Sequence, residues 1–286
     1  MPPERIIAEG VEVALGERLL DSRPMGGGCI GEVYRAELSE GTYVVAKVDR
    51  AGDSHLEREA YMLRYLREKS ELPVPEVYHS SGALLLMEFV AGGGEPSRAQ
   101  VHAAELLAAL HGVSAAAYGH ERDTLIGNLS QPNPWTESWV EFFRDQRLLY
   151  LAEVASKAGR LPANLQNRVE GLAGRVGEIL EEPEYPVLIH GDVWSGNALA
   201  EGDRITAFID PAIYHADPEI ELAYISLFGT FGEPFFRRYA EVRPIRPGFF
   251  EERRHLYSLY PLLVHVYFFG GHYVGSVEGT LSRLGF

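Results

Sequence analysis

The first ninety residues follow the short hydrophobic period of β-strands. Residues 18–49 alternate between apolar and polar positions, and the sequence SEGT within them suits a hairpin turn. Two further apolar segments, PVPEVYHS at 73–80 and GALLLMEFV at 82–90, predict two more strands. We therefore expect a sheet in the N-terminal part of the chain.

Helical periodicity occurs at the start of the chain, over residues 55–70, and through most of the sequence beyond residue 97. The helix expected at 55–70 places Leu56, Ala60, Leu63 and Arg67 on one face. After the flexible sequence AGGGEPS, Ser97 is a candidate N-cap for the next helix. Two short strands, PVLIH and RITAFID, interrupt this region, whose expected helices cover 98–115, 136–157, 162–182 and most of 217–281.

The change of period after AGGGEPS predicts two lobes. Residues 1–91 form a β-rich N-terminal lobe, and residues 92–286 form a larger, mainly helical C-terminal lobe. The expected fold class is therefore α+β.

The composition narrows the classes of partner. With 46% hydrophobic and 11% aromatic residues the chain is globular, and its formal charge of −15 argues against binding nucleic acid or an anionic membrane. A single cysteine, Cys29, excludes an internal disulfide framework. The sequence shows neither a secretory signal nor an apolar stretch long enough to span a bilayer. We expect a cytoplasmic protein with small-molecule partners.

A glycine-rich stretch lies between two expected strands. Residues 26–33, GGGCIGEV, satisfy G-x-G-x-x-G-x-V, and a hairpin context favours a flap over nucleotide phosphates rather than a dinucleotide fingerprint, which must open a helix. Lys47 follows in the strand YVVAKV, where it can reach the α- and β-phosphates.

Lys47 needs an anionic partner, and the helix at 55–70 offers two. Glu59 lies three residues after Leu56 and four before Leu63, on the apolar face, whereas Glu57 points about 100° away. Because a carboxylate that faces inward requires a cation, we expect Glu59 to pair with Lys47.

The sequence HGDVWSGN predicts a catalytic loop. It matches H-x-D-x-x-x-x-N, in which Asp192 accepts the proton of an attacking hydroxyl and Asn197 binds Mg²⁺. Asp210 ends the strand RITAFID, and a strand that runs out and another that returns would bring it beside Asn197 as a second metal ligand. His190 is expected to orient the loop by hydrogen bonding.

These motifs resemble those of the protein-kinase-like superfamily in its small-molecule branch. HGD occupies the place of the protein-kinase motif HRD, and IDP occupies the place of DFG. Within it the chain is similar to the fructosamine kinase, or ketosamine-3-kinase, family. The similarity is carried by GGGCI, HGDVWSGN, FIDPAIYHADPEIELAYISLFG and the insert IGNLSQPNPWTESWVEFFRDQRL. It departs from that family at Gly31, where some relatives carry serine, and at Pro218, where an arginine is common.

The resemblance implies a two-lobe kinase fold and ATP- and Mg²⁺-dependent phosphorylation of the sugar 3-hydroxyl of a ketosamine, free or linked to a protein. Such a reaction leads to deglycation, because the product releases the amine. Two alternatives are another small-molecule hydroxyl kinase, acting on an aminoglycoside or a choline-like substrate, and a nucleotide-binding pseudoenzyme.

The acceptor site has three main candidates, and Glu219 and Glu221 are weaker ones. Trp194 supplies an apolar or stacking wall or else packs in the core, and Asp217 attracts the amine or else caps the helix that starts near Pro218. His190 is the third.

Cys29, in an anion-binding loop, is either a redox-sensitive thiol that could link two chains or a small filling residue, so the oligomeric state is open between monomer and dimer. The residues assigned to the nucleotide are Gly26, Gly27, Gly28, Cys29, Ile30, Gly31, Lys47, Met87, Glu88 and Val90.

Overall fold

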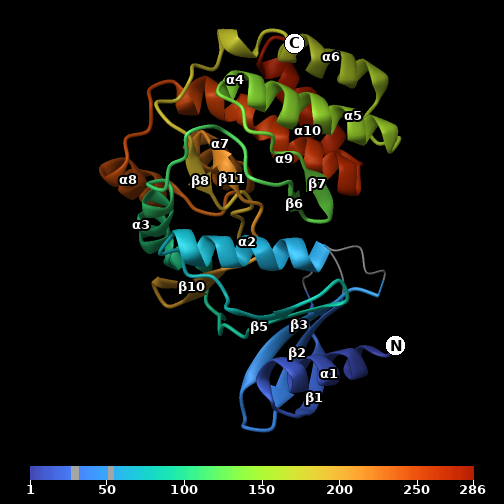
Figure 1. Cartoon of the computed structure of the whole chain (residues 1–286). Helices are drawn as coiled ribbons and strands as arrows, with labels where there is room; N and C mark the ends of the chain where they lie inside the picture. Colours follow the sequence, from blue (N-terminus) through green and yellow to red (C-terminus); the bar gives the residue numbers. More distant parts are fainter. Residues whose placement is uncertain (27–31, 51–54) are drawn as a thin grey trace.

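The computed structural model describes residues 1–26, 32–50 and 55–286. A sheet-rich part occupies one end of the molecule and a larger helical part the other, with α2 between them (Figure 1). This confirms the expected α+β class. The nucleotide residues Gly27, Gly28, Cys29, Ile30 and Gly31 lie outside the described residues.

The N-terminal part is a five-stranded sheet in which every neighbouring pair is antiparallel, in the order β1-β2-β3-β5-β4. Helix α1 covers one face, where Ile7 and Val11 pack in a cluster with apolar side chains of the sheet. The sequence SEGT forms the turn between β2 and β3, as predicted. The elements are α1 (Pro3–Leu15), β1 (Leu19–Pro24), β2 (Glu32–Leu38), β3 (Tyr43–Val48), α2 (His55–Lys69), β4 (Val77–Ser80) and β5 (Leu84–Glu88).

The other side of the sheet shares its core with the helical part. Leu56 and Leu63 of α2 and Met87 of β5 belong to one buried cluster with Ala103 and Leu107 of α3. The apolar core is therefore continuous between the two parts, although we expected the lobes to divide after β5. Hydrophobic burial holds α2 to both parts of the molecule.

The C-terminal part is mainly helical, with three two-stranded β-ladders. None of its helices, nor any other helix in the described ranges, is long and apolar enough to cross a membrane. Its helices and strands are α3 (Gln100–Leu110), β6 (Thr124–Ile126), β7 (Leu129–Gln131), α4 (Trp139–Phe142), α5 (Tyr150–Lys157), α6 (Ala163–Ala173), β8 (Val187–Ile189), β9 (Ala198–Glu201), β10 (Arg204–Phe208), β11 (Tyr214–Ala216), α7 (Pro218–Phe228), α8 (Glu233–Val242), α9 (Arg254–Phe269) and α10 (His272–Arg283); π-helical turns cover Phe143–Leu149 and Phe249–Arg253, and 3₁₀ turns Pro96–Arg98 and Val176–Glu178.

One local prediction was wrong in this part, and another needs a later start. Ser97 is not an N-cap, because it lies inside a 3₁₀ turn and α3 begins only at Gln100, with Ala99 before it. The helix expected over 136–157 starts at Trp139 and passes through a π-helical turn between α4 and α5. There the Ser138 side chain caps the start by accepting the N–H of Glu141.

Two β-ladders bring the loop 190–197 and Asp210 together. Strand β8 pairs with β11, and β9 pairs with β10, so that Asn197 before β9 lies opposite Ile209 after β10. The N–H of Ile209 donates to the carbonyl of Asn197 at 2.9 Å. The return of the chain predicted from the sequence is thus present.

The first turn of this loop depends on Gly191. Its φ of +87° lies in the region that favours glycine. A Cβ there would stand 2.2 Å from the carbonyl oxygen of Ala212, and the Gly191 N–H donates to Glu221 Oε1 at 2.6 Å. The chain at Gly191 therefore passes between Ala212, which precedes β11, and Glu221 of α7 with no room for a side chain.

We predict that Gly191→Ala destabilises the protein by about 3 kcal/mol or more, because backbone strain and a clash with backbone act together. Gly202→Ala is the matched control: Gly202 has φ +61°, but nothing lies within 4 Å of its would-be Cβ. That change should cost about 1–2 kcal/mol. Urea unfolding of both variants measures the difference, and equal losses would contradict the packing argument.

Candidate active site

Lys47 lies between two carboxylates that come from different parts of the molecule. Its Nζ is 2.7 Å from Glu59 Oε1 on α2 and 2.5 Å from Asp210 Oδ1 after β10. The predicted pairing with Glu59 is confirmed. Burial by itself lowers the pKa of Lys47, but the attraction of the two carboxylates outweighs it and raises the pKa, so the ammonium stays charged.

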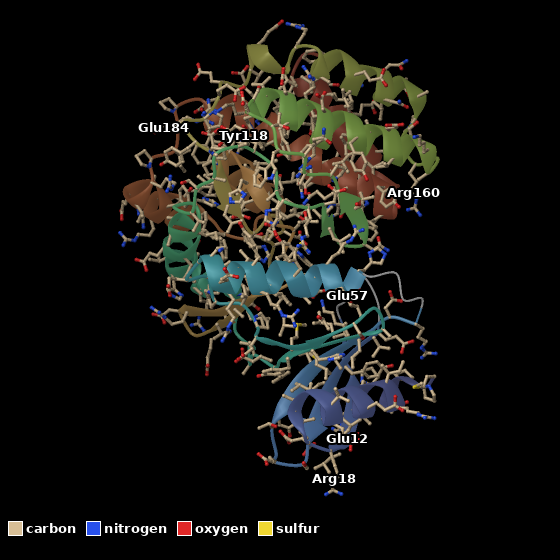
Figure 2. All side chains as sticks on the ribbon, in the orientation of Figure 1. Glu12, Arg18, Glu57, Tyr118, Arg160 and Glu184 are labelled. Carbon is tan, nitrogen blue, oxygen red and sulfur yellow. The ribbon has the colours of Figure 1, made fainter. Side chains whose placement is uncertain are left out.

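Strand alternation and helical periodicity produce this pair. Val44, Ala46 and Val48 of β3 pack toward α1, so Val45 and Lys47 face α2. On α2, Glu59 is largely buried, whereas Glu57 is exposed and lies at the start of the helix in Figure 2.

Asp210 has an unusual backbone. Among the non-glycine residues in the described ranges, Asp210 alone has a positive φ, of +53°. Such conformations are uncommon and occur where the surrounding structure enforces them. One oxygen of its carboxylate pairs with Lys47, yet the side chain is still 38% exposed. The carboxylate can therefore accept a second cation from the solvent side.

Asp192 lies in the loop after β8, where two donors hold its carboxylate. The Tyr224 hydroxyl donates to Oδ1, and the Asn197 amide donates to Oδ2 at 2.9 Å. Burial raises the pKa of Asp192 to about 7, the charges of Asp210 and Glu221 add to the rise, and the two hydrogen bonds oppose it. A carboxylate with this pKa can accept a proton near neutral pH.

The Asn197 side chain is oriented by the same contacts. Its Nδ2 also donates to the backbone carbonyl of Asp192 at 3.0 Å, so its amide nitrogen is committed and its Oδ1 is the atom left to bind a cation. Together with Asp210 it provides two hard oxygen ligands, the type that Mg²⁺ prefers. The described residues contain no group of three or more His, Cys, Asp or Glu side chains placed to hold a metal.

The His190 side chain supports the backbone of the loop 190–197. The Asp192 N–H donates to His190 Nδ1 at 3.3 Å, which is the orienting role expected from the sequence. Burial lowers the pKa of this histidine. Its side chain is fully buried, so the alternative assignment of His190 to the acceptor site was wrong.

The two other acceptor candidates differ in exposure. Trp194 is 37% exposed, and its indole folds back over Gly196, where a Cβ would stand 2.3 Å from the ring. Asp217 is 1% exposed, with Oδ1 accepting the Glu219 N–H at 2.9 Å and Oδ2 accepting from Tyr257 and Arg246. The helix-cap alternative for Asp217 is confirmed, and Pro218 occupies the first position of α7. Since both carboxylate oxygens are engaged, an acceptor contact does not fit.

The described nucleotide candidates lie around the sheet. Gly26 follows β1 and is exposed, Met87 and Glu88 end β5 beside β3, and Val90 begins the segment that leads to the helical part. The N–H of Glu88 already donates to the Glu76 carbonyl at 2.8 Å. These nucleotide contacts stay predictions.

Two residues of α7 were missed or underrated by the sequence reasoning. Tyr224 bonds Asp192, and Glu221, considered only as a weak acceptor candidate, is buried and accepts from Gly191 and from His111 Nε2 at 2.9 Å. These hydrogen bonds lower the pKa of Glu221 against the effect of burial. The signal was the spacing of Asp217, Glu221, Tyr224 and Phe228, which share one helical face.

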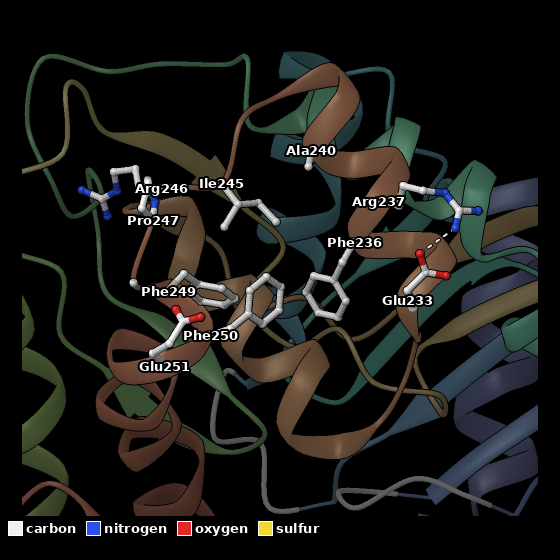
Figure 3. Close-up of a pocket in the computed structure, with 11 residues that line it drawn as sticks. Glu233, Phe236, Arg237, Ala240, Ile245, Arg246, Pro247, Phe249, Phe250 and Glu251 are labelled. Carbon is white, nitrogen blue, oxygen red and sulfur yellow. Dashed lines mark hydrogen bonds and ion pairs between the residues drawn. The ribbon is translucent and has the colours of Figure 1, made fainter.

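A separate hollow of about 750 Å³ lies beside α8 (Figure 3). Phe236, Phe249 and Phe250 line it, and Arg237 at its edge pairs with Glu233 at 2.6 Å. Its lining contains none of the residues of the candidate site. The remaining lining residues are Ala240, Ile245, Arg246, Pro247, Gly248 and Glu251.

A family model and two relatives match most of this chain. The family model described as fructosamine kinase matches residues 5–285. A protein of Synechocystis sp. named "Probable ketoamine kinase" is 34% identical over 294 residues, covering 98% of this chain and 96% of its own. A chloroplastic protein-ribulosamine 3-kinase of Oryza sativa subsp. indica is 33% identical over 276 residues, covering 90% and 77%.

Solved structures show the same shape. A fructosamine-3-kinase homologue from Thermobifida fusca superposes with a TM-score of 0.87 at 31% identity, over 97% of this chain and 98% of that one. A variant of the aminoglycoside phosphotransferase APH(4)-Ia, in complex with ADP and hygromycin B, gives a TM-score of 0.71 at 17% identity, over 99% and 98%. The second similarity shows a common fold.

We predict that Glu59→Gln weakens Mg-ATP binding about tenfold, because it removes one of the two charges that position the Lys47 ammonium. Glu57→Gln, two residues away on the exposed face, is the matched control and should bind as the wild type does. Calorimetric titration with a non-hydrolysable ATP analogue measures both. Equal affinities in the two variants would refute the positioning role of Glu59.

We predict that Tyr224→Phe moves the acid limb of the kcat profile upward by about one pH unit. The Tyr224 hydrogen bond lowers the pKa of Asp192, so its loss raises that pKa; activity, which requires the carboxylate, then disappears at higher pH as the pH falls. Tyr150→Phe removes the same atom from a bond to the Ser130 carbonyl and serves as control. An unshifted limb in Tyr224→Phe would contradict this reading.

Proposed function

The chain belongs to the fructosamine kinase family, and from this premise we propose that it transfers a phosphoryl group from ATP to the sugar 3-hydroxyl of ketosamines, the adducts of sugars with amines. The observation that carries the proposal is the loop in which Asp192 and Asn197 are fixed together, opposite the Lys47–Glu59 pair. The enzyme is a phosphotransferase that acts on a hydroxyl group.

The base in this reaction is Asp192. Its carboxylate is held by Tyr224 and Asn197 and has a pKa near 7, so it can orient the acceptor hydroxyl and take its proton as the new phosphate ester forms. Positioning contributes most of the rate in phosphoryl transfer, since little covalent chemistry falls to the protein.

The nucleotide is held from the sheet side. Lys47 provides a buried ammonium for the α- and β-phosphates, and Glu59 would hold it in place if Asp210 bound Mg²⁺. Glycine-rich residues 26–33, together with Met87, Glu88 and Val90, complete the proposed nucleotide contacts.

Asn197 Oδ1 and Asp210 are the proposed ligands of Mg²⁺. Their amide and carboxylate oxygens are hard donors of the type that Mg²⁺ prefers, so these two residues would fit the ion. When bound, Mg²⁺ neutralises charge on the transferring phosphoryl group.

Deglycation is the proposed role, since a ketosamine phosphorylated on the 3-hydroxyl releases its amine. On the acceptor side, the exposed indole of Trp194 is the proposed stacking wall. The acceptor is either a small molecule or the sugar adduct of a protein side chain. We propose residues 1–91 as the nucleotide-binding lobe and residues 92–286 as the catalytic and acceptor-binding lobe.

We predict ADP release with Mg-ATP and fructosyl-lysine or ribulosyl-lysine, and little with an aminoglycoside or choline. Asp192→Asn keeps the size of the side chain but removes the base, so it should lower kcat by about 10²–10⁴-fold with ATP binding nearly unchanged. A coupled ADP assay over the four acceptors measures this. Preferred turnover of the aminoglycoside would assign the chain a different acceptor, and absence of turnover with ATP still bound would favour the pseudoenzyme.

A further inference from the structure

A series of rings leads away from the catalytic base. The ring of Tyr224, whose hydroxyl bonds Asp192, lies 4.9 Å from that of Phe228, one turn later on α7. Phe228 lies 4.8 Å from His265 on α9, and His265 lies 5.6 Å from Phe269. We call these residues, with Tyr273 at 4.7 Å from His265, the aromatic run.

The aromatic run ends in solvent. Tyr224 is buried, Phe228 and His265 are half-buried, and Phe269 is 56% exposed. Arg160, whose guanidinium donates to the Phe268 carbonyl, marks this end of α9 in Figure 2, at the same edge of the molecule as Glu57 at the start of α2. Contacts between neighbouring rings thus run from Tyr224, which bonds Asp192, to the surface at the junction of α9 and α10.

His265 adds a hydrogen-bond acceptor to the aromatic run. Its Nδ1 lies 2.8 Å from the Pro261 carbonyl, which can only accept, so Nδ1 carries the proton. Burial lowers the pKa of His265, which favours the neutral ring. The Nε2 atom then holds a free lone pair and can accept a hydrogen bond from a ligand.

We propose that Phe228, His265 and Phe269 bind the amine half of the ketosamine: the protonated nitrogen and the apolar chain that carries it. This inference rests on the proposed function. The nitrogen of a ketosamine is attached to C1, only two carbons from the carbon that bears the hydroxyl, so it would lie near Asp192, and the proposal places the chain that leaves the nitrogen along the aromatic run.

The chemistry of the aromatic run matches that ligand. Ring faces attract a cation and pack against methylene groups, and His265 Nε2 accepts an N–H bond without carrying a charge that would repel the ammonium. Trp194 on the catalytic loop is left to contact the sugar. The residues therefore divide recognition between the sugar and its amine.

The test is steady-state kinetics with fructosyl-lysine and with ATP as separately varied substrates. His265→Phe keeps a ring but removes the acceptor, and should raise the KM for fructosyl-lysine about tenfold with the KM for ATP unchanged. His265→Gln, whose side-chain oxygen can accept, should recover most of this loss. Phe269→Ala should raise the same KM by about 2–5-fold.

The matched control is Phe250→Ala, an exposed phenylalanine that lines the hollow beside α8 and should leave both KM values unchanged. The inference is overturned if the KM for fructosyl-lysine is unchanged in the His265 and Phe269 variants, or if the KM for ATP rises equally. A wild-type enzyme that turns over no ketosamine would instead disprove the proposed function, and the inference with it.

Discussion

A buried ammonium needs compensating charge, and this requirement joins the parts of the molecule. Lys47 is held by Glu59 from a helix and by Asp210 from a strand end more than 160 residues away. Removing one partner of such a buried pair is costly, because the remaining charge is left desolvated. The positions of α2, of β3 and of the strained backbone at Asp210 are therefore mutually dependent.

A single helix, α7, organises the other side of the site. Asp217 caps its start, Glu221 accepts the Gly191 N–H of the loop 190–197 one turn later, and the Tyr224 hydroxyl donates to the proposed base, Asp192. All three residues lie on one face of α7. The position of Asp192 is therefore fixed by a helix and not by the loop alone. Preorganisation of this kind is what phosphoryl transfer demands of a protein.

The features predicted from the sequence are those encoded by local periodicity. Alternation along β3 and the helical face of α2 were enough to pair Lys47 with Glu59. The loop from His190 to Asn197 was recognisable by spacing. Tyr224 was not foreseen and Glu221 was underrated, because their partners lie 30 or more residues away and only tertiary packing brings them together. His190 was partly misassigned because a sequence shows a residue type but not its burial.

The apolar cluster that runs from α2 and β5 into α3 has a consequence for how the chain folds. Separated at residue 91, the N-terminal piece would keep the cluster between α1 and the sheet but would expose Leu56, Leu63 and Met87 to water. Because this cluster is shared, we expect a change that disrupts it from either side to lower the stability of both parts of the molecule.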